Sequence, residues 1–525
     1  MTAAPPPAPG TPPAPPQPAV LALPTAAALV VLASAAVLAL EIVVQRLVVP
    51  YVGLTLDTST AAIGVALAGI AAGTFLGGRA ADRVEPRLTL GPSFAAAGLL
   101  VLLARPLALL LGPVLQGGGP AASVVLTTVA VGAPITVLAA VPPAVIKTRL
   151  ADLGETGAEV GRIDALSTLG ALAGTFVTGY VLLGQLSTTT ILGVTGAVLV
   201  AVGLLLVGLR RRLTPASRTP GGNYPGAGRL LTPVPLVLLA VAAGAALVGV
   251  RGPCEYETRY YCARVDTPEG APTQRLLLLD DLRHAQVDLA DPTALQFAYT
   301  QRFADVLDTA RPPGAPLDVL HLGGGGFTMP RWLAATRPGS RSTVLEIDPA
   351  IVRINREELA LDSVPDLTVR TGDARTSLAA EPADAYDAVV GDAFGSLSVP
   401  WHLATQEFIR DVERVLRPEG VFVLNVIDNP PLDFVRAETA TLATVFDEVA
   451  VLARPGQLAG ESGGNYVLVA SDAPLDTARL ERDAASRGEV DGVAGEEFGV
   501  GGRVLTDDDA PVDQLITPLY AVRRG

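Results

Sequence analysis

The 525-residue chain has little cysteine and little charge, and each shortage excludes a class of protein. Two cysteines are too few for a disulfide-rich secreted scaffold or for a four-cysteine zinc site. Charged residues make up 17% of the chain and hydrophobic residues 50%, which excludes a disordered protein and disfavours an ordinary soluble one. The net charge of −14 argues against a nucleic-acid-binding protein.

The charge that is present is divided unevenly between the two halves of the chain. Residues 1–250 carry 13 basic and 8 acidic side chains, whereas residues 251–525 carry 25 basic and 44 acidic ones. This contrast predicts a membrane domain over 21–250 followed by an acidic soluble half. Residues 1–20 are rich in proline and contain no lysine or arginine, so we expect a disordered tail and interpret the first apolar run as a retained signal anchor.

Seven apolar runs in the first half have roughly the 20 residues that a helix needs to cross a bilayer. Basic residues gather in the loops after the second, fourth and sixth runs. By the positive-inside rule, this pattern predicts a multi-pass protein of the cell membrane, with a cytoplasmic N-terminus and an extracytoplasmic C-terminal domain. The seven runs are 21–44, 58–78, 92–115, 121–145, 165–185, 188–208 and 231–250.

Two charged residues and two cysteines stand out near these runs. Glu41 and Arg105 lie within apolar runs, where charge is costly, so we predict an ion pair between them; the alternative is that each reaches separately toward an interface. Cys254 and Cys262 follow the last run, on the side predicted to be oxidising, which favours a disulfide over two buried free thiols. No histidine lies nearer to them than His284, so the pattern does not favour a metal site.

The soluble half alternates apolar strands with amphipathic helices from residue 316 onward. Strands are expected at 317–322, 343–347, 367–371, 386–391 and 421–427, with helices near 329–336, 349–360 and 404–416. This order predicts a Rossmann-like α/β domain over 316–525, of the class I methyltransferase type, with a parallel sheet covered on both faces. Residues 251–315 are expected to form a small β subdomain, including a strand at 274–279, and a connecting helix.

The residues that suggest a ligand site follow the ends of four of these strands. Ligands bind at this edge of a parallel sheet, and glycines let the backbone approach a nucleoside closely. A carboxylate at the end of the second strand can accept hydrogen bonds from both ribose hydroxyls, and one after the third strand from an adenine amino group. Each feature alone is also typical of a turn or a helix cap, but their order favours a nucleoside site. In strand order they are Gly323, Gly324 and Gly325; Glu346; Asp373 with Ala374; and Asp392.

In their order and spacing, these motifs resemble the spermidine synthase family of polyamine aminopropyltransferases, and more narrowly its bacterial members that are fused to membrane helices. The stretch Leu279-Asp280-Asp281 with Gln286, and Asp291 with Tyr299, also resemble family motifs. The resemblance implies aminopropyl transfer from decarboxylated S-adenosylmethionine to putrescine or a related amine, with no permanently bound cofactor, and often a homodimer. It implies that Asp392 is the general base, and that Gln286 and Tyr299 line the amine side.

His402 follows the predicted catalytic loop and is a further candidate for the amine side, although such a residue also commonly caps or packs a loop. The chain departs from the family pattern where Gly326 and Gly395 replace acidic residues, and where Thr300-Gln301 replace a His-Glu pair. Two alternatives therefore stay open. One is an S-adenosylmethionine-dependent methyltransferase, and the other is a non-catalytic nucleoside- or polyamine-binding module on a transport or sensing domain. The bilayer, a nucleoside and a polyamine are the expected partners.

Overall fold

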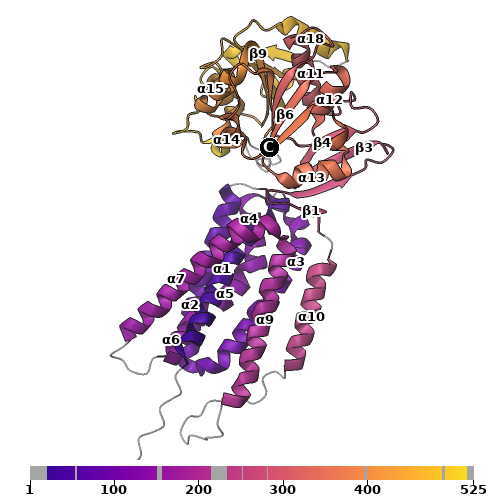
Figure 1. The fold of residues 1–525 in the computed structure, drawn as a ribbon. Helices are drawn as coiled ribbons and strands as arrows, with labels where there is room; N and C mark the ends of the chain where they lie inside the picture. Colours follow the sequence, from indigo (N-terminus) through magenta and orange to yellow (C-terminus); the bar gives the residue numbers. More distant parts are fainter. Residues whose placement is uncertain are drawn as a thin grey trace, which may run out of the picture.

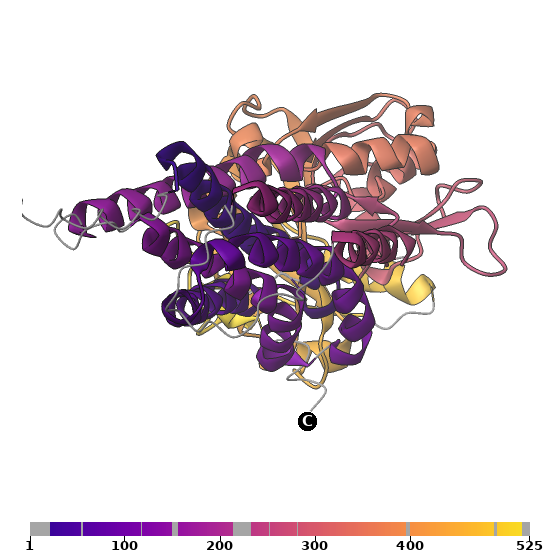
Figure 2. The ribbon, with the colours of Figure 1, turned by 90° about the horizontal axis from the view of Figure 1, so that it is seen from below.

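The structure is a computed structural model that describes residues 21–53, 56–116, 118–149, 156–213, 233–250, 252–280, 282–394, 399–487 and 491–516. The tail at 1–20, Gly395 and Asp281 lie outside the described residues. A bundle of helices carries an α/β domain at one end (Figure 1), and the helices lie over that domain when seen from the far end of the bundle (Figure 2). The predicted fold class, apolar helices followed by a Rossmann-like domain, is confirmed.

The helical half is long and apolar enough to cross a membrane several times. Its helices pack closely because glycine replaces larger residues where they meet: a Cβ at Gly73 of α2 would lie 2.2 Å from the carbonyl oxygen of Thr136. Among the described residues, six segments have the length and hydropathy of a span: Leu23–Val52 (α1), Leu56–Arg83 (α2), Pro86–Leu115 (α3), Gly119–Arg149 (α4, η1, α5 and α6), Thr156–Gln185 (α7, η3 and α8) and Thr188–Leu209 within α9 (Thr188–Leu213).

The seventh predicted span, 231–250, coincides with the apolar helix α10 over the residues that the structure describes. Helix α10 (Pro233–Gly249) has 17 residues. At 1.5 Å per residue it covers about 25 Å, less than the ~30 Å of a typical hydrocarbon core. It packs along α3 and α9 within the bundle (Figure 1). Among the described residues there are thus six helices of spanning length and one shorter apolar helix, and the count of seven spans stays a prediction.

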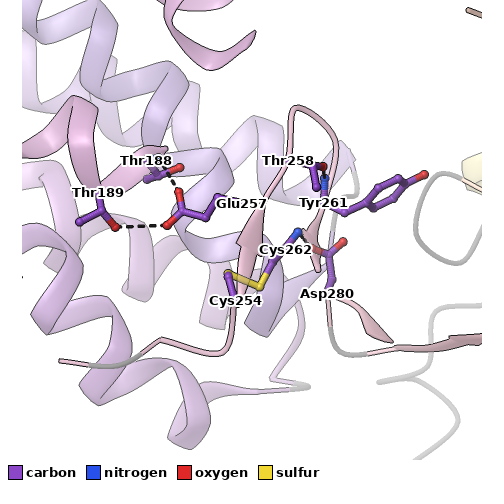
Figure 3. Close-up of a disulfide and its surroundings, with 8 residues drawn as sticks. All are labelled: Thr188, Thr189, Cys254, Glu257, Thr258, Tyr261, Cys262 and Asp280. Atoms are coloured by element: carbon purple, nitrogen blue, oxygen red, sulfur yellow. Dashed lines mark hydrogen bonds between the residues drawn. A yellow bond between two sulfur atoms is a disulfide. The ribbon is translucent and has the colours of Figure 1, made fainter. Parts of the chain in front are cut away.

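The contacts of the helix ends show which end of the bundle carries the soluble half. At one end, Arg149 donates a hydrogen bond to the carbonyl oxygen of Leu21, just before α1. At the other end, Glu257 of the soluble half accepts hydrogen bonds from the Thr188 amide and the Thr189 hydroxyl at the start of α9 (Figure 3). The start of α1 and the soluble half therefore lie at opposite ends of the bundle.

The ion pair predicted between Glu41 and Arg105 is wrong. The Nη1 of Arg105 instead donates to the carbonyl oxygens of Leu247 and Val250, each at 2.7 Å, where α10 ends. The last carbonyls of a helix have no partner within the helix and carry partial negative charge, so a guanidinium can satisfy them without a carboxylate. Arg105 thereby joins α3 to the segment that leads into the soluble half.

A small antiparallel sheet begins the soluble half, and its strand β3 lies where the sequence predicted one. A disulfide joins Cys254 to Cys262, whose Cα atoms lie 4.9 Å apart, and so ties the start of this segment to β2 (Figure 3). The Cys262 amide donates to the Asp280 carboxylate at 3.1 Å. In sheet order the strands are β1 (Tyr256–Glu257), β2 (Cys262–Asp266), β3 (Gln274–Leu279) and β4 (Leu282–Asp288).

The main sheet has the strand order β12-β10-β11-β9-β8-β5-β6-β7 in the described part of the chain. The strands from β9 to β7 in this order are parallel, as predicted, whereas β10, β11 and β12 pair antiparallel and were not predicted. The strands are β5 (Asp318–Leu322), β6 (Arg341–Glu346), β7 (Leu367–Thr371), β8 (Tyr386–Gly391), β9 (Leu416–Asp428), β10 (Glu448–Ala453), β11 (Gly464–Ser471) and β12 (Gly492–Ala494).

Helices cover both faces of this sheet because successive residues of each buried strand point to opposite sides. In β5, Val319 packs with Phe303 of α11, and the next residue, Leu320, lies in the apolar cluster that contains Phe408 of α15. The helices of the soluble half are α11 (Ala298–Ala310), α12 (Thr328–Thr336), α13 (Pro349–Glu358), α14 (Ala374–Leu378), α15 (Gln406–Val415), α16 (Asp433–Leu442), α17 (Pro455–Leu458), α18 (Thr477–Ser486) and α19 (Val512–Leu515), with 3-10 turns η4 (Leu361–Ser363), η5 (Trp401–Leu403) and η6 (Glu496–Gly499).

Candidate functional site

The strand order reverses between β5 and β8, and the loops that leave these two strands diverge there. Such a switch point opens a crevice at the carboxyl ends of the strands. Gly323 begins the loop after β5 with a φ of +95°, and a Cβ there would lie 2.6 Å from the carbonyl oxygen of Asp392. Only glycine fits both the backbone conformation and this close approach. The glycine run thus brings the β5 and β8 loops into contact.

Glu346 ends β6 and is buried beside the glycine loop. Its Oε2 accepts a hydrogen bond from the Gly324 amide at 2.7 Å, and its Oε1 accepts one from the Asp348 amide at 2.8 Å. Burial raises the pKa of Glu346 to about 6, against the opposing effect of these amide hydrogen bonds. Each carboxylate oxygen keeps a second lone pair for a ligand, as ribose binding requires.

Asp392 follows β8 and joins a chain of hydrogen bonds that crosses the sheet edge. The Tyr299 hydroxyl of α11 donates to its Oδ2 at 3.0 Å, and the Asn425 side chain of β9 donates to its Oδ1 at 3.0 Å. Asn465 of β11 in turn donates to Asn425 at 3.0 Å. Burial raises the pKa of Asp392 to about 6. The carboxyl group is therefore held in place and titrates close to neutral pH.

Two cavities meet at Asp392. One, of about 160 Å³, is lined by the glycine loop, Glu346 and Asp373; the other, of about 630 Å³, is lined by Tyr299 and Asn425. Asp392 lines both, together with His284 and Phe394. A ligand in the smaller cavity and a second ligand in the larger one could therefore meet beside Asp392. The arrangement suits a reaction between two substrates.

The sequence analysis grouped His402 with Tyr299 on the amine side, but the structure places the two residues in different cavities. The Nε2 of His402 donates to the Oδ2 of Asp373 at 2.9 Å, and both of these residues line the smaller cavity. Asp373 also caps α14 by accepting from the Thr376 amide at 3.0 Å. Although burial acts to raise it, these two hydrogen bonds hold the pKa of Asp373 below its ordinary value. Ala374, beside Asp373, lines the same cavity.

Gln286 lies on β4 but lines neither of the two cavities. It donates to Gln274 at 2.6 Å and accepts from Arg283 at 2.7 Å, so it positions Arg283, which does line the larger cavity. Gly326 also packs against β4: a Cβ on it would lie 2.6 Å from the Cβ of Ala285. Glycine at position 326 is therefore favoured by the packing against β4.

Four residues of the site were missed by the sequence analysis. Asn425 and Asn465 lie within strands β9 and β11, where single polar residues among apolar ones could have signalled a buried network. His284 of β4 lies at the boundary of the two cavities, and burial lowers its pKa to about 4, so it is neutral there at pH 7. Tyr261 lines the smaller cavity and donates to the carbonyl oxygen of Phe394 at 2.7 Å, and nothing in its local sequence marks it.

Comparison with known proteins adds a second line of evidence. A methyltransferase domain family matches residues 320–424, a segment that contains the glycine loop, Glu346, Asp373 and Asp392. The polyamine aminopropyltransferase of Vibrio vulnificus is 32% identical over 155 residues, covering 29% of this chain and 50% of that protein. The soluble half is spermidine synthase-like.

The similarity to known proteins is not confined to the spermidine synthase-like half. Polyamine aminopropyltransferase 2 of Streptomyces coelicolor is 27% identical over 311 residues, covering 56% of this chain and 54% of that protein. That share of the chain exceeds residues 251–525, so the match extends into the helical half. The chain spans about half the length of these two relatives. A crystal structure of a probable spermidine synthase from Corynebacterium glutamicum is 28% identical, with a TM-score of 0.45, and covers 48% of this chain and 95% of that chain.

Proposed function

We propose that the chain is an aminopropyltransferase that moves a 3-aminopropyl group from decarboxylated S-adenosylmethionine to an amine. The observation that carries the proposal is the position of Asp392, which lies where the two cavities meet and is held by Tyr299 and Asn425. The spermidine synthase-like similarity of the soluble half supports the same class of enzyme.

The reaction is a displacement at carbon. The lone pair of the acceptor nitrogen attacks the aminopropyl carbon that is bonded to the sulfonium sulfur. The C–S bond breaks, its electron pair stays on sulfur, and the leaving product is methylthioadenosine. The new C–N bond leaves a protonated secondary amine, whose proton passes to Asp392. A carboxyl group with a pKa of about 6 is ionised at pH 7 and is matched to this role as a base.

The smaller cavity is assigned to the nucleoside of the donor. Glu346 accepts from the ribose hydroxyls through the lone pairs that the Gly324 and Asp348 amides leave free. Asp373 and the backbone of Ala374 hold the adenine edge, and His402 orients Asp373 through its hydrogen bond. Gly323, Gly324 and Gly325 line this cavity, so the donor lies against the backbone of the glycine loop.

The test is an assay of the full chain, purified in detergent, for methylthioadenosine release. With decarboxylated S-adenosylmethionine as the donor and a panel of amines as acceptors, we expect methylthioadenosine and an aminopropylated amine in equal amounts. A reaction that consumes S-adenosylmethionine and releases S-adenosylhomocysteine instead would favour a methyltransferase. Binding of methylthioadenosine with no turnover of any donor would favour a non-catalytic module.

We further propose that the protein spans the cell membrane with its soluble half outside. Lys147 pairs with Asp82 at 2.9 Å, so the basic ends of α2 and α6 lie at the end of the bundle where α1 begins. By the positive-inside rule that end is cytoplasmic, and the opposite end carries the soluble half with its disulfide.

The chain contains two cysteines, so a thiol label reports on this one loop. In intact cells, we expect a membrane-impermeant maleimide to label Cys254 and Cys262 only after treatment with an impermeant reductant. A variant in which both cysteines are serine is the control and should stay unlabelled. Labelling that requires permeabilised cells would place the soluble half in the cytoplasm and contradict the proposal.

A further inference from the structure

The larger cavity, which the proposed reaction assigns to the acceptor, is lined by more positive than negative charge. Three arginines line it: Arg283 of β4, Arg302 of α11, and Arg454, which follows β10. Among the described residues that line it, Asp392 is the one carboxylate. A pocket that grips a diamine would show the opposite balance, because each ammonium group of a dication needs a nearby acid.

One of the three arginines is neutralised within the protein. Arg302 forms a two-pronged ion pair with Asp491, with nitrogen–oxygen distances of 2.7 and 2.6 Å, and both side chains are almost fully buried. This arginine belongs to the structure of the domain and contributes little net charge to the cavity. The net charge of the larger cavity therefore depends mainly on Arg283 and Arg454.

Neither of these two arginines has an ion-pair partner in the part of the chain that the structure describes. Arg283 lies over the ring of Phe297, 5.6 Å from its centroid, and donates to the neutral Gln286. Arg454 is exposed, and its backbone amide, not its guanidinium, makes its hydrogen bond to Gln457. Two arginines without a carboxylate partner among the described residues thus line the same cavity as Asp392.

A guanidinium presents a planar fork of N–H donors that matches the two oxygens of a carboxylate, and it repels an ammonium group. We propose that the acceptor is an amine that carries a carboxylate: its nitrogen reaches Asp392, and its carboxylate binds Arg454 and Arg283. This inference rests on the proposed function and names its substrate class. The same displacement then joins the aminopropyl carbon to the nitrogen of an amino acid, with methylthioadenosine as the leaving product and the proton on Asp392.

The test compares two acceptors of equal chain length on the full chain in detergent, with decarboxylated S-adenosylmethionine as the donor. Putrescine has an ammonium group at each end, whereas 4-aminobutanoate has an ammonium group at one end and a carboxylate at the other. We expect kcat/KM for 4-aminobutanoate to exceed that for putrescine by at least about tenfold, from one charge-assisted contact. Arg454→Glu should reverse this preference, and Arg283→Glu should shift it in the same direction. The matched control is Arg482→Glu, on the exposed side of α18 and outside the cavity.

The outcomes separate this inference from the proposed function. Release of methylthioadenosine with a preference for putrescine would overturn the inference and leave the aminopropyltransferase intact. Release of methylthioadenosine from S-adenosylmethionine, which keeps its own carboxylate, would indicate that the arginines bind the donor's carboxylate. This result would also overturn the inference. If no amine releases methylthioadenosine although the protein binds it, the proposed function fails, and the inference fails with it. The wild-type comparison decides the matter even where a charge-reversal variant does not fold.

Discussion

Replacing Asp392 by asparagine is expected to lower kcat by about 10²–10⁴-fold, the range typical of removing a general base. Asparagine keeps the shape of the side chain and one acceptor oxygen, so the hydrogen-bonded chain through Tyr299 and Asn425 can persist. It cannot take the proton from the attacking amine. Methylthioadenosine release by the full chain, measured with the best acceptor found, checks this expectation.

The pH dependence gives an independent readout of the same residue. Burial raises the pKa of Asp392 to about 6, so the group is a carboxylate above this pH and a carboxylic acid below it. Because the ionised form is the base, the wild-type rate should rise with pH and level off above about 6. The asparagine variant should lose this limb of the profile. A variant that keeps both a near wild-type kcat and the limb at pH 6 would contradict the role assigned to Asp392.

Replacing Glu346 by glutamine is expected to weaken nucleoside binding by about 10- to 100-fold, since a hydrogen bond to a charged group contributes about 1.5–3 kcal/mol. Both oxygens of Glu346 accept from backbone amides, those of Gly324 and Asp348. Glutamine has one carbonyl oxygen, so its NH₂ group must face one of these donors, and it has fewer lone pairs for a ribose. Calorimetric titration of the full chain with methylthioadenosine measures the change.

The matched control for this variant lies one helix away. Glu357, exposed on α13, is not in either cavity, and Glu357→Gln removes the same charge from the same region. We expect its affinity for methylthioadenosine to equal that of the wild-type chain. If Glu346→Gln binds as tightly as the control, the smaller cavity does not hold a nucleoside through this residue.

The parts of the fold that were predicted correctly depend on local patterns. The strands that became β5 to β9 are short apolar runs, and the glycines after β5 mark a loop whose backbone no other residue can adopt. The strands β10, β11 and β12 were missed although helices α16, α17 and α18 precede them in the chain, and they pair antiparallel where the alternation would predict parallel strands. Their existence depends on the free edge that β9 offers, which is a property of the assembled sheet.

The residues that were misplaced depend on contacts between segments far apart in sequence. His402 was grouped with Tyr299 from its position after β8, but the turn η5 brings it to the cap of α14 instead. Arg105 was paired with Glu41 because a buried charge needs a partner, and carbonyl oxygens at the end of α10 satisfy it equally well. Sequence indicates that a polar group requires a partner, but the packing of the elements decides which partner it finds.

The close packing of Gly326 on β4 also bears on how this chain can change. Placing an acidic side chain at this position has a steric cost, because its Cβ would meet the Cβ of Ala285. A substitution such as Ala285→Gly removes this contact, so we expect Gly326→Asp to destabilise the chain less in that background than alone. The effect of a change at position 326 therefore depends on the residue at position 285.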